Sequence, residues 1–219
     1  MQEYHLIEPV YNQESHILIL GSFPSVKSRE ANFYYYHPQN RFWKILEHLY
    51  CQPHLETINE KKEFLLNNKI ALWDVIASCD IIGSSDSSIK NVLVNDLEKI
   101  INESKIEYIY TNGNLANKLY HQYFAHKISI PVIKLPSSSP ANASYSLEKL
   151  ISCWKVINSG NNNDEVIKMN EGQKRFYDYI LKRVISGKEE HAKMLLNESF
   201  KKQEAKTFNQ EYLQYFMKE

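Results

Sequence analysis

The sequence predicts an α/β fold built on a parallel sheet, because short apolar runs alternate with amphipathic segments over residues 16–157. The first run, at 17–20, is continuously apolar, which is typical of a strand buried on both faces of a sheet. We predict strands at 16–20, 69–75, 107–111 and 131–135. The segments between and after them predict helices at 40–50, 57–68, 94–104, 114–124 and 144–157.

Capping residues mark the starts of three of these helices. Asn40 is expected at or near the N-cap of the first helix, whose apolar residues recur at helical spacing. Thr57 and Glu60 have the spacing of a capping box, and Asn95 is the expected cap of the third helix. The segment 78–89 is rich in Ser, Asp and Gly, and its composition predicts a loop.

The best domain boundary is the polar, turn-prone segment 159–164. We expect a first domain over 1–158, in which residues 4–15 pack beside the sheet. A helical extension is expected over 165–219, with apolar stripes that would pack on the main domain or on a partner chain. A protein partner or self-association through these helices is therefore one prediction.

Composition limits the class of protein. The 219 residues are 43% hydrophobic and 24% charged, as in globular proteins, and no apolar run reaches about 18 residues. The N-terminus lacks the pattern of a signal peptide, so we expect a cytoplasmic protein away from membranes. Cys51, Cys79 and Cys153 have no metal-binding spacing and suit reduced thiols. A net charge of zero is unusual for a DNA-binding protein, but a local basic rim suffices for transient binding.

Three polar loops follow predicted strands. They lie at 21–40, 112–114 and 136–142. Because the carboxyl ends of parallel strands meet at one edge of a sheet, where ligands bind, these loops predict one shared site.

Two of these loops carry motifs. The first contains GSFPS at 21–25, followed by Ser28, YY at 34–35, HP at 37–38, Asn40 and FW at 42–43. The second is LPSSSPANA at 135–143. Together they resemble the uracil-DNA glycosylase superfamily, and most of all its branch acting on hypoxanthine. The resemblance covers residues 15–158 and implies a three-layer α/β/α sandwich with a four-stranded parallel sheet.

The resemblance also implies roles for individual residues. Asn40 is the expected catalytic residue, since its amide can orient a water or bond a base or sugar. The residues expected to bind the base are Gly21, Ser22, Phe23, Tyr34, Tyr35 and Asn112. Those expected to contact the DNA backbone are Ser25, Ser28, Pro136, Ser137, Ser138, Ser139 and Asn142.

Several of these residues have simpler alternatives. Asn40 would also serve as a helix cap, and Asn112 as part of a turn with Gly113. Phe23 and the tyrosines either stack on a flipped base or pack in the walls. Asp74, at the end of the second strand, is either structural or part of the pocket.

The sequence departs from the family pattern at three positions. Phe23 occupies a position where many branches carry a polar residue that handles the attacking water. Ser137 stands where several relatives have a histidine, which argues against uracil excision by that histidine. Tyr36 stands where the family often has a small residue, so the shape of the pocket is open.

We therefore predict a monofunctional DNA glycosylase of base-excision repair that hydrolyses the N-glycosidic bond of a deaminated base, with hypoxanthine favoured. Stabilising the leaving base needs preorganised donors, so we expect no metal and no cofactor. The expected partner is DNA containing a deaminated base. A uracil or mispaired-thymine glycosylase is one alternative. A non-catalytic nucleic-acid-binding module is the other, because folds host many functions.

Overall fold

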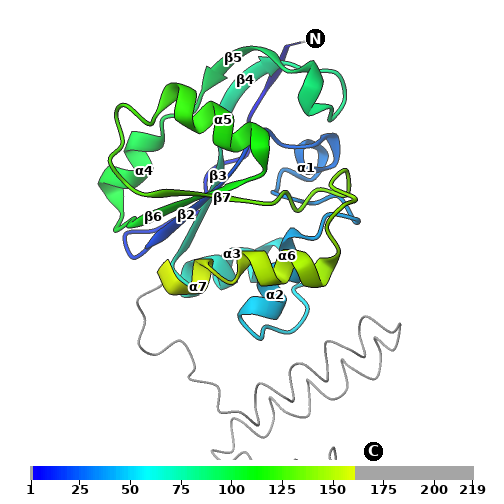
Figure 1. The fold of residues 1–219 in the computed structure, drawn as a ribbon, viewed down its shortest axis with the longest axis vertical. Coiled ribbons are helices and arrows are strands. Elements are labelled where there is room, and N and C mark those ends of the chain that lie inside the picture. Colours follow the sequence, from blue (N-terminus) through cyan, green and yellow to red (C-terminus); the bar gives the residue numbers. More distant parts are fainter. Residues whose placement is uncertain (1, 161–219) are drawn as a thin grey trace, which may run out of the picture. The chain divides into compact units, whose positions relative to one another are not determined.

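The structure is a computed structural model that describes residues 2–160 (Figure 1). The helical extension predicted over 165–219 lies outside the described residues. None of the helices within residues 2–160 is long and apolar enough to cross a bilayer.

A four-stranded parallel sheet forms the centre, with the strand order β3-β2-β6-β7. Residues 17–20 of the central β2 are completely buried, because this strand lies between two neighbours and is covered on both faces. The strands are β2 (Ile17–Gly21), β3 (Ile70–Asp74), β6 (Tyr108–Asn112) and β7 (Val132–Leu135). All four predicted strands are present, and the predicted α/β fold with a parallel sheet is confirmed.

Helices cover both faces of this sheet, as in a three-layer sandwich (Figure 1). On one face, Leu18 and Leu20 share a core with residues of α4 and α5. On the other lie α2, α3, α6 and α7. The bounds are α2 (Phe42–Leu49), α3 (Ile58–Asn67), α4 (Leu97–Glu103), α5 (Asn114–Tyr123), α6 (Leu147–Trp154) and α7 (Ile157–Gly160).

The predicted helix caps are partly correct. Thr57 and Glu60 form the expected capping box at α3. Helix α4, however, is capped by Asp96, whose side chain accepts from the Lys99 N–H. Asn95 is instead buried, and its Nδ2 donates to the carbonyl oxygen of Asp74 at 2.9 Å. This amide therefore ties the end of β3 to the chain entering α4.

The prediction of a loop over 78–89 is wrong for its first residues. Strand β4 (Ile76–Asp80) pairs antiparallel with β1 (Gln2–Tyr4) and with β5 (Lys90–Val94), and together they form a second sheet. The polar composition of the segment suggested a loop, but pairing with a strand more than seventy residues away overrides this local preference. The rest of the segment contains the short helix η1 (Asp86–Ser88).

Two further elements position the first motif. Residues 26–31 lie within the loop predicted over 21–40, but they form helix α1 (Val26–Ala31), which is capped by the Ser25 side chain. The lead-in at 4–15 reaches β3, where the backbones of Val10 and Leu72 exchange two hydrogen bonds of 3.0 and 2.8 Å. The N-terminal segment thus runs beside the sheet, as predicted.

Candidate active site

A cavity of about 390 Å³ lies at the carboxyl ends of β2, β3 and β6. The loops that follow β2, β4 and β7 complete its wall. Apart from Pro136 and Asn142, every site residue predicted from the sequence lines it, and these are Gly21, Ser22, Phe23, Ser25, Ser28, Tyr34, Tyr35, Asn40, Asn112, Ser137, Ser138 and Ser139. The topology therefore brings together residues that lie about a hundred positions apart in the chain.

Asn40, Ser138 and Asn112 form a continuous hydrogen-bonded chain in this cavity. Asn112 Nδ2 donates to Ser138 Oγ at 2.9 Å, and Ser138 Oγ donates to Asn40 Oδ1 at 3.0 Å. The backbone N–H of Ser138 donates back to Asn112 Oδ1, also at 2.9 Å. Ser138 is completely buried, so it serves as the link between the two amides.

The orientation of the Asn40 amide follows from its partners. Its Oδ1 also accepts the backbone N–H of Phe42 at 3.0 Å, and so caps the start of α2. With two donors directed at one oxygen, the amide oxygen must lie on that side. No described residue accepts a hydrogen bond from Asn40 Nδ2. The group that Asn40 can offer to a ligand is therefore an N–H donor.

Arg41, which sequence reasoning missed, holds the second motif in place. Its guanidinium donates to the carbonyl oxygens of Ser138, Ser139, Asn142 and Tyr145, and its backbone N–H donates to Ser138 as well. A planar guanidinium with five N–H groups suits such a cluster of acceptors. Its position directly after Asn40 could have suggested a role in the site. The sequence could not show its partners, however, because they lie 97 to 104 residues away in the chain.

The rest of the loop 136–142 is organised by bonds to its own backbone and to α6. The Pro136 carbonyl accepts from Trp154 Nε1 at 3.0 Å. Asn142 Nδ2 donates to the Ser137 carbonyl at 2.9 Å, while the hydroxyls of Ser137 and Ser139 accept backbone N–H groups. Pro136 and Asn142 therefore support the loop from outside the cavity wall.

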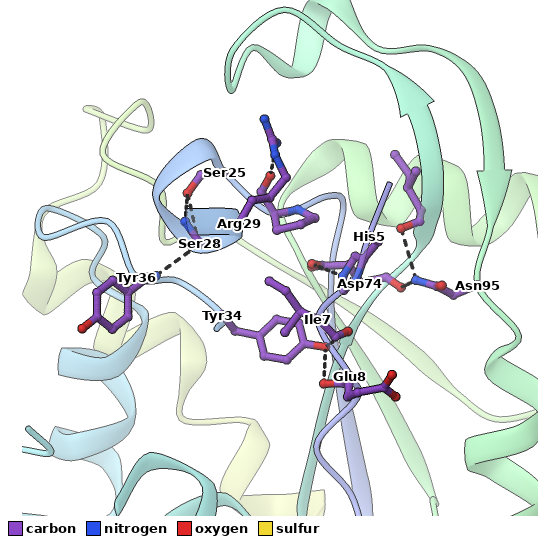
Figure 2. A network of polar contacts seen from close by, with 12 residues as sticks. His5, Ile7, Glu8, Ser25, Ser28, Arg29, Tyr34, Tyr36, Asp74 and Asn95 are labelled. Atoms are coloured by element: carbon purple, nitrogen blue, oxygen red, sulfur yellow. Dashed lines mark hydrogen bonds and ion pairs between the residues drawn. The ribbon is translucent and has the colours of Figure 1, made fainter. Parts of the chain in front are cut away.

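The predicted aromatic residues form one side of the cavity, and each is held differently. Tyr35 stacks on Phe42, with ring centroids 4.0 Å apart. Tyr34 is buried, and its hydroxyl bonds the carbonyl oxygens of Ile7 and Glu8, so only its ring can face a ligand (Figure 2). Phe23 packs edge-on against the His5 ring, with centroids 6.1 Å apart. These contacts make a preformed apolar wall.

The two serines of the first motif are engaged in local structure. Ser25 caps α1, and its Oγ lies 3.1 Å from that of Ser28 (Figure 2). Ser28 is only 2% exposed, and its Oγ accepts the Tyr36 N–H. Ser28 thus has little surface left for a phosphate, whereas Ser25 is partly exposed at the cavity.

Two carboxylates also line the cavity. Asp74 is buried at the end of β3 and pairs with His5 Nε2 at 2.9 Å (Figure 2). Asp86 accepts from Ser22 Oγ at 3.5 Å. Although Asp86 is an exposed residue, desolvation of its carboxyl at the cavity and, to a smaller extent, the nearby charge of Asp74 raise its pKa, an effect partly offset by the Ser22 hydrogen bond. Within residues 2–160, no three His, Cys, Asp or Glu side chains gather closely enough to hold a metal ion.

The sequence profile of the Uracil DNA glycosylase superfamily matches residues 8–158, which include the whole cavity. The chain belongs to the uracil DNA glycosylase superfamily. The resemblance inferred from the two motifs is thereby confirmed.

Individual relatives agree with this membership. A protein of Methanosarcina acetivorans named hypoxanthine DNA glycosylase is 34% identical over 152 residues, which are 68% of this chain and 93% of the relative. A protein of Methanosarcina barkeri with the same name is 39% identical over 89 residues, 40% of this chain and 56% of the relative. A solution NMR structure from Methanosarcina acetivorans, described as a candidate uracil DNA glycosylase, superposes with a TM-score of 0.61 at 28% identity, covering 72% of this chain and 99% of that one.

Proposed function

We propose that this DNA glycosylase removes hypoxanthine from DNA by hydrolysing its N-glycosidic bond. The observation that supports the proposal most is the Asn40–Ser138–Asn112 chain, which holds an amide donor at the cavity. The names of the two Methanosarcina relatives favour hypoxanthine among the deaminated bases.

The target base must leave the duplex to reach this cavity. Its ring would lie against the wall formed by Phe23, Tyr34 and Tyr35. As the glycosidic bond breaks, negative charge develops on the base and positive charge on the sugar. Asn40 Nδ2 would donate a hydrogen bond to the departing base. The Asn40 amide oxygen already accepts from the Phe42 N–H and from the Ser138 hydroxyl, which in turn accepts from Asn112. These bonds polarise the amide and hold it in place, so it need not reorganise during the reaction.

A group that accepts the proton of the attacking water is still required, since Phe23 replaces the usual polar residue. We propose that Asp86 has this role. Its carboxylate lines the cavity beside Ser22, and the upward shift of its pKa strengthens it as a base. The Asn40 amide cannot act in this way, because it does not titrate near neutral pH.

We further propose that the enzyme is monofunctional and serves base-excision repair in the cytoplasm. A lyase step would need a free amine to form a Schiff base. Lys27, the lysine within the first motif, is instead exposed and paired with Glu30 at 2.8 Å. Water is therefore the proposed nucleophile. The proposed domain division places this activity in residues 1–158.

Two other functions give different experimental results. Uracil shares the N–H and carbonyl pattern of hypoxanthine and would fit the same donors, so a uracil or mispaired-thymine glycosylase would differ only in base preference. A binding module, which Phe23 at the usual polar position favours, would bind DNA without turnover.

The test is alkali-revealed strand cleavage of duplexes that carry one hypoxanthine, uracil or xanthine at the same position. We expect hypoxanthine to be released fastest, and Asn40→Ala to slow release by about 100-fold or more. Asn114→Ala is the matched control, since Asn114 is an exposed asparagine in the first turn of α5. Faster release of uracil would establish the first alternative. DNA binding without cleavage of any of the three would establish the second.

A further inference from the structure

The Phe23 side of the cavity wall is supported by Arg29, which lies in the last turn of α1. The guanidinium carbon of Arg29 lies 5.5 Å from the centroid of the Phe23 ring, a distance typical of a cation–π contact. Phe23 lines the cavity, whereas Arg29 does not. The aromatic ring therefore lies between the guanidinium and the cavity, and this part of the wall rests on a charged group.

The guanidinium of Arg29 is held in turn by three parts of the chain. Its Nη1 donates to the carbonyl oxygen of Pro24 at 2.7 Å (Figure 2). Its Nη2 donates to the carbonyl oxygen of Gly83 at 3.5 Å, and its Nε lies 3.7 Å from a carboxylate oxygen of Glu3 in β1. The Arg29 side chain is 19% exposed, so most of it is removed from solvent. A planar guanidinium can make these contacts together, whereas an ammonium group cannot match their directions.

The contact with Gly83 joins the first motif to the loop between β4 and β5. This loop has internal order, because Ser88 Oγ accepts the Ile82 N–H at 2.9 Å. A second bond, from the Val26 N–H to Ser84 Oγ at 3.0 Å, joins the same loop to the start of α1. The support of the first motif is therefore in place before any substrate enters.

These contacts also indicate what Arg29 does not do. All three nitrogen atoms of its guanidinium face protein oxygens, so they are not directed at a DNA phosphate. Its route to the cavity is the Phe23 ring. That ring has a second neighbour in His5, whose ring meets it edge-on with centroids 6.1 Å apart. Phe23 is thus held by two neighbours while it remains partly exposed at the cavity.

We propose that Arg29 is a positioning residue of the reaction, which acts through Phe23 and holds its ring where the flipped base stacks; this inference rests on the proposed function. A base stacked on a fixed ring lies at a defined distance from the Asn40 donor. A ring that could turn or retreat would let the base take several orientations, and only some of them would bring it to Asn40. Misplacement of this kind slows the chemical step more than it weakens DNA binding.

The experiment measures single-turnover release of hypoxanthine in a double-mutant cycle that combines Arg29→Met with Phe23→Leu. Methionine keeps an unbranched apolar side chain but removes the guanidinium, and leucine keeps apolar volume but removes the ring. At saturating enzyme, we expect Arg29→Met to slow release by about 10- to 100-fold when Phe23 is present, and by less than about threefold in the Phe23→Leu background. The enzyme concentration that gives half the maximal rate should change by less than about threefold.

Arg29→Lys keeps a positive charge beside the ring but not the planar set of donors, so its rate should lie between those of Arg29→Met and the wild type. Circular dichroism first establishes that each variant is folded. If Arg29→Met is not folded, Arg29→Lys replaces it in the cycle, and its smaller loss should likewise disappear in the Phe23→Leu background.

Lys27→Met is the matched control, since it removes a positive charge from the same helix at an exposed residue that pairs with Glu30. This variant should keep the wild-type rate at saturating enzyme. If the substitution of Arg29 slows release by the same factor in both backgrounds, or only weakens DNA binding, Arg29 does not act through Phe23 and the inference is overturned. A wild-type enzyme that releases no hypoxanthine would overturn the proposed function itself, and the inference with it.

Discussion

The two polar sides of the cavity are built in opposite ways. On the amide side, Asn40, Ser138 and Asn112 bond one another, and the Asn40 Nδ2 group has no acceptor among the described residues. On the carboxylate side, Asp74 uses one oxygen to pair with His5, and no described residue donates a hydrogen bond to the other, Oδ1. A satisfied network holds its members rigidly, whereas an acceptor without a donor is open to a ligand. The comparison indicates that the amide side is fixed before a ligand binds, whereas the carboxylate side keeps an acceptor open to it.

The largest effect is expected from removing the support of the amide side. Arg41→Met would remove the guanidinium donors from four carbonyl oxygens of the loop 136–145, of which those of Ser138, Ser139 and Asn142 keep a backbone N–H donor. We expect the free energy of unfolding to fall by about 2–4 kcal/mol and base release to become about 100-fold slower. Chemical denaturation and single-turnover rates measure the two losses.

Arg41→Lys serves as the matched variant, because it keeps the charge but not the planar set of donors. Its losses should lie between those of Arg41→Met and the wild type. A wild-type rate in Arg41→Met would show that the loop 136–145 keeps its shape without this residue.

A smaller effect is expected from Asp86. If Asp86 accepts the proton of water, it acts when deprotonated, so the rate falls as the pH drops through its pKa. Because that pKa is raised, this acidic limb lies at a higher pH than for an ordinary aspartate. We expect Asp86→Asn to slow base release by about 10- to 100-fold and to abolish the limb.

The pH profile of single-turnover rates provides the measurement. The Ser22 hydroxyl donates a hydrogen bond to the Asp86 carboxylate, and this bond lowers the pKa of Asp86. Ser22→Ala should therefore move the acidic limb to a still higher pH. An unchanged limb in Asp86→Asn would assign it to another group.

The smallest effect is expected far from both sides, at the cap of α3. Thr57→Ala removes the side-chain acceptor of the capping box and should lower the free energy of unfolding by about 1 kcal/mol. The rate and the base preference should stay unchanged. A thermal melt with the cleavage assay measures both, and a changed base preference would mean that the cavity responds to general loss of stability.

The parallel sheet could be predicted from the sequence because its strands are continuous apolar runs bounded by turn residues. The antiparallel pairing of β1 and β4 could not, since it joins a segment of polar composition to the N-terminus. The same limit applies to the site. Asn40 and Ser138 belong to motifs that are visible in the chain, whereas the contacts of Arg41 with the second motif and of His5 with Asp74 join residues 69 to 104 positions apart. Such pairs become visible only when the sheet brings the strand ends together.

In the proposed mechanism, Asn40 acts as a hydrogen-bond donor and not only as a helix cap. The most direct measurement is the single-turnover rate of hypoxanthine release by Asn40→Asp. Aspartate keeps an oxygen for the Phe42 N–H and the Ser138 hydroxyl, but it lacks the Nδ2 donor. We expect Asn40→Asp to give a folded protein of nearly wild-type stability that releases hypoxanthine at least about 100-fold more slowly than the wild type. A rate equal to that of the wild type would contradict this mechanism and leave Asn40 as the cap of α2.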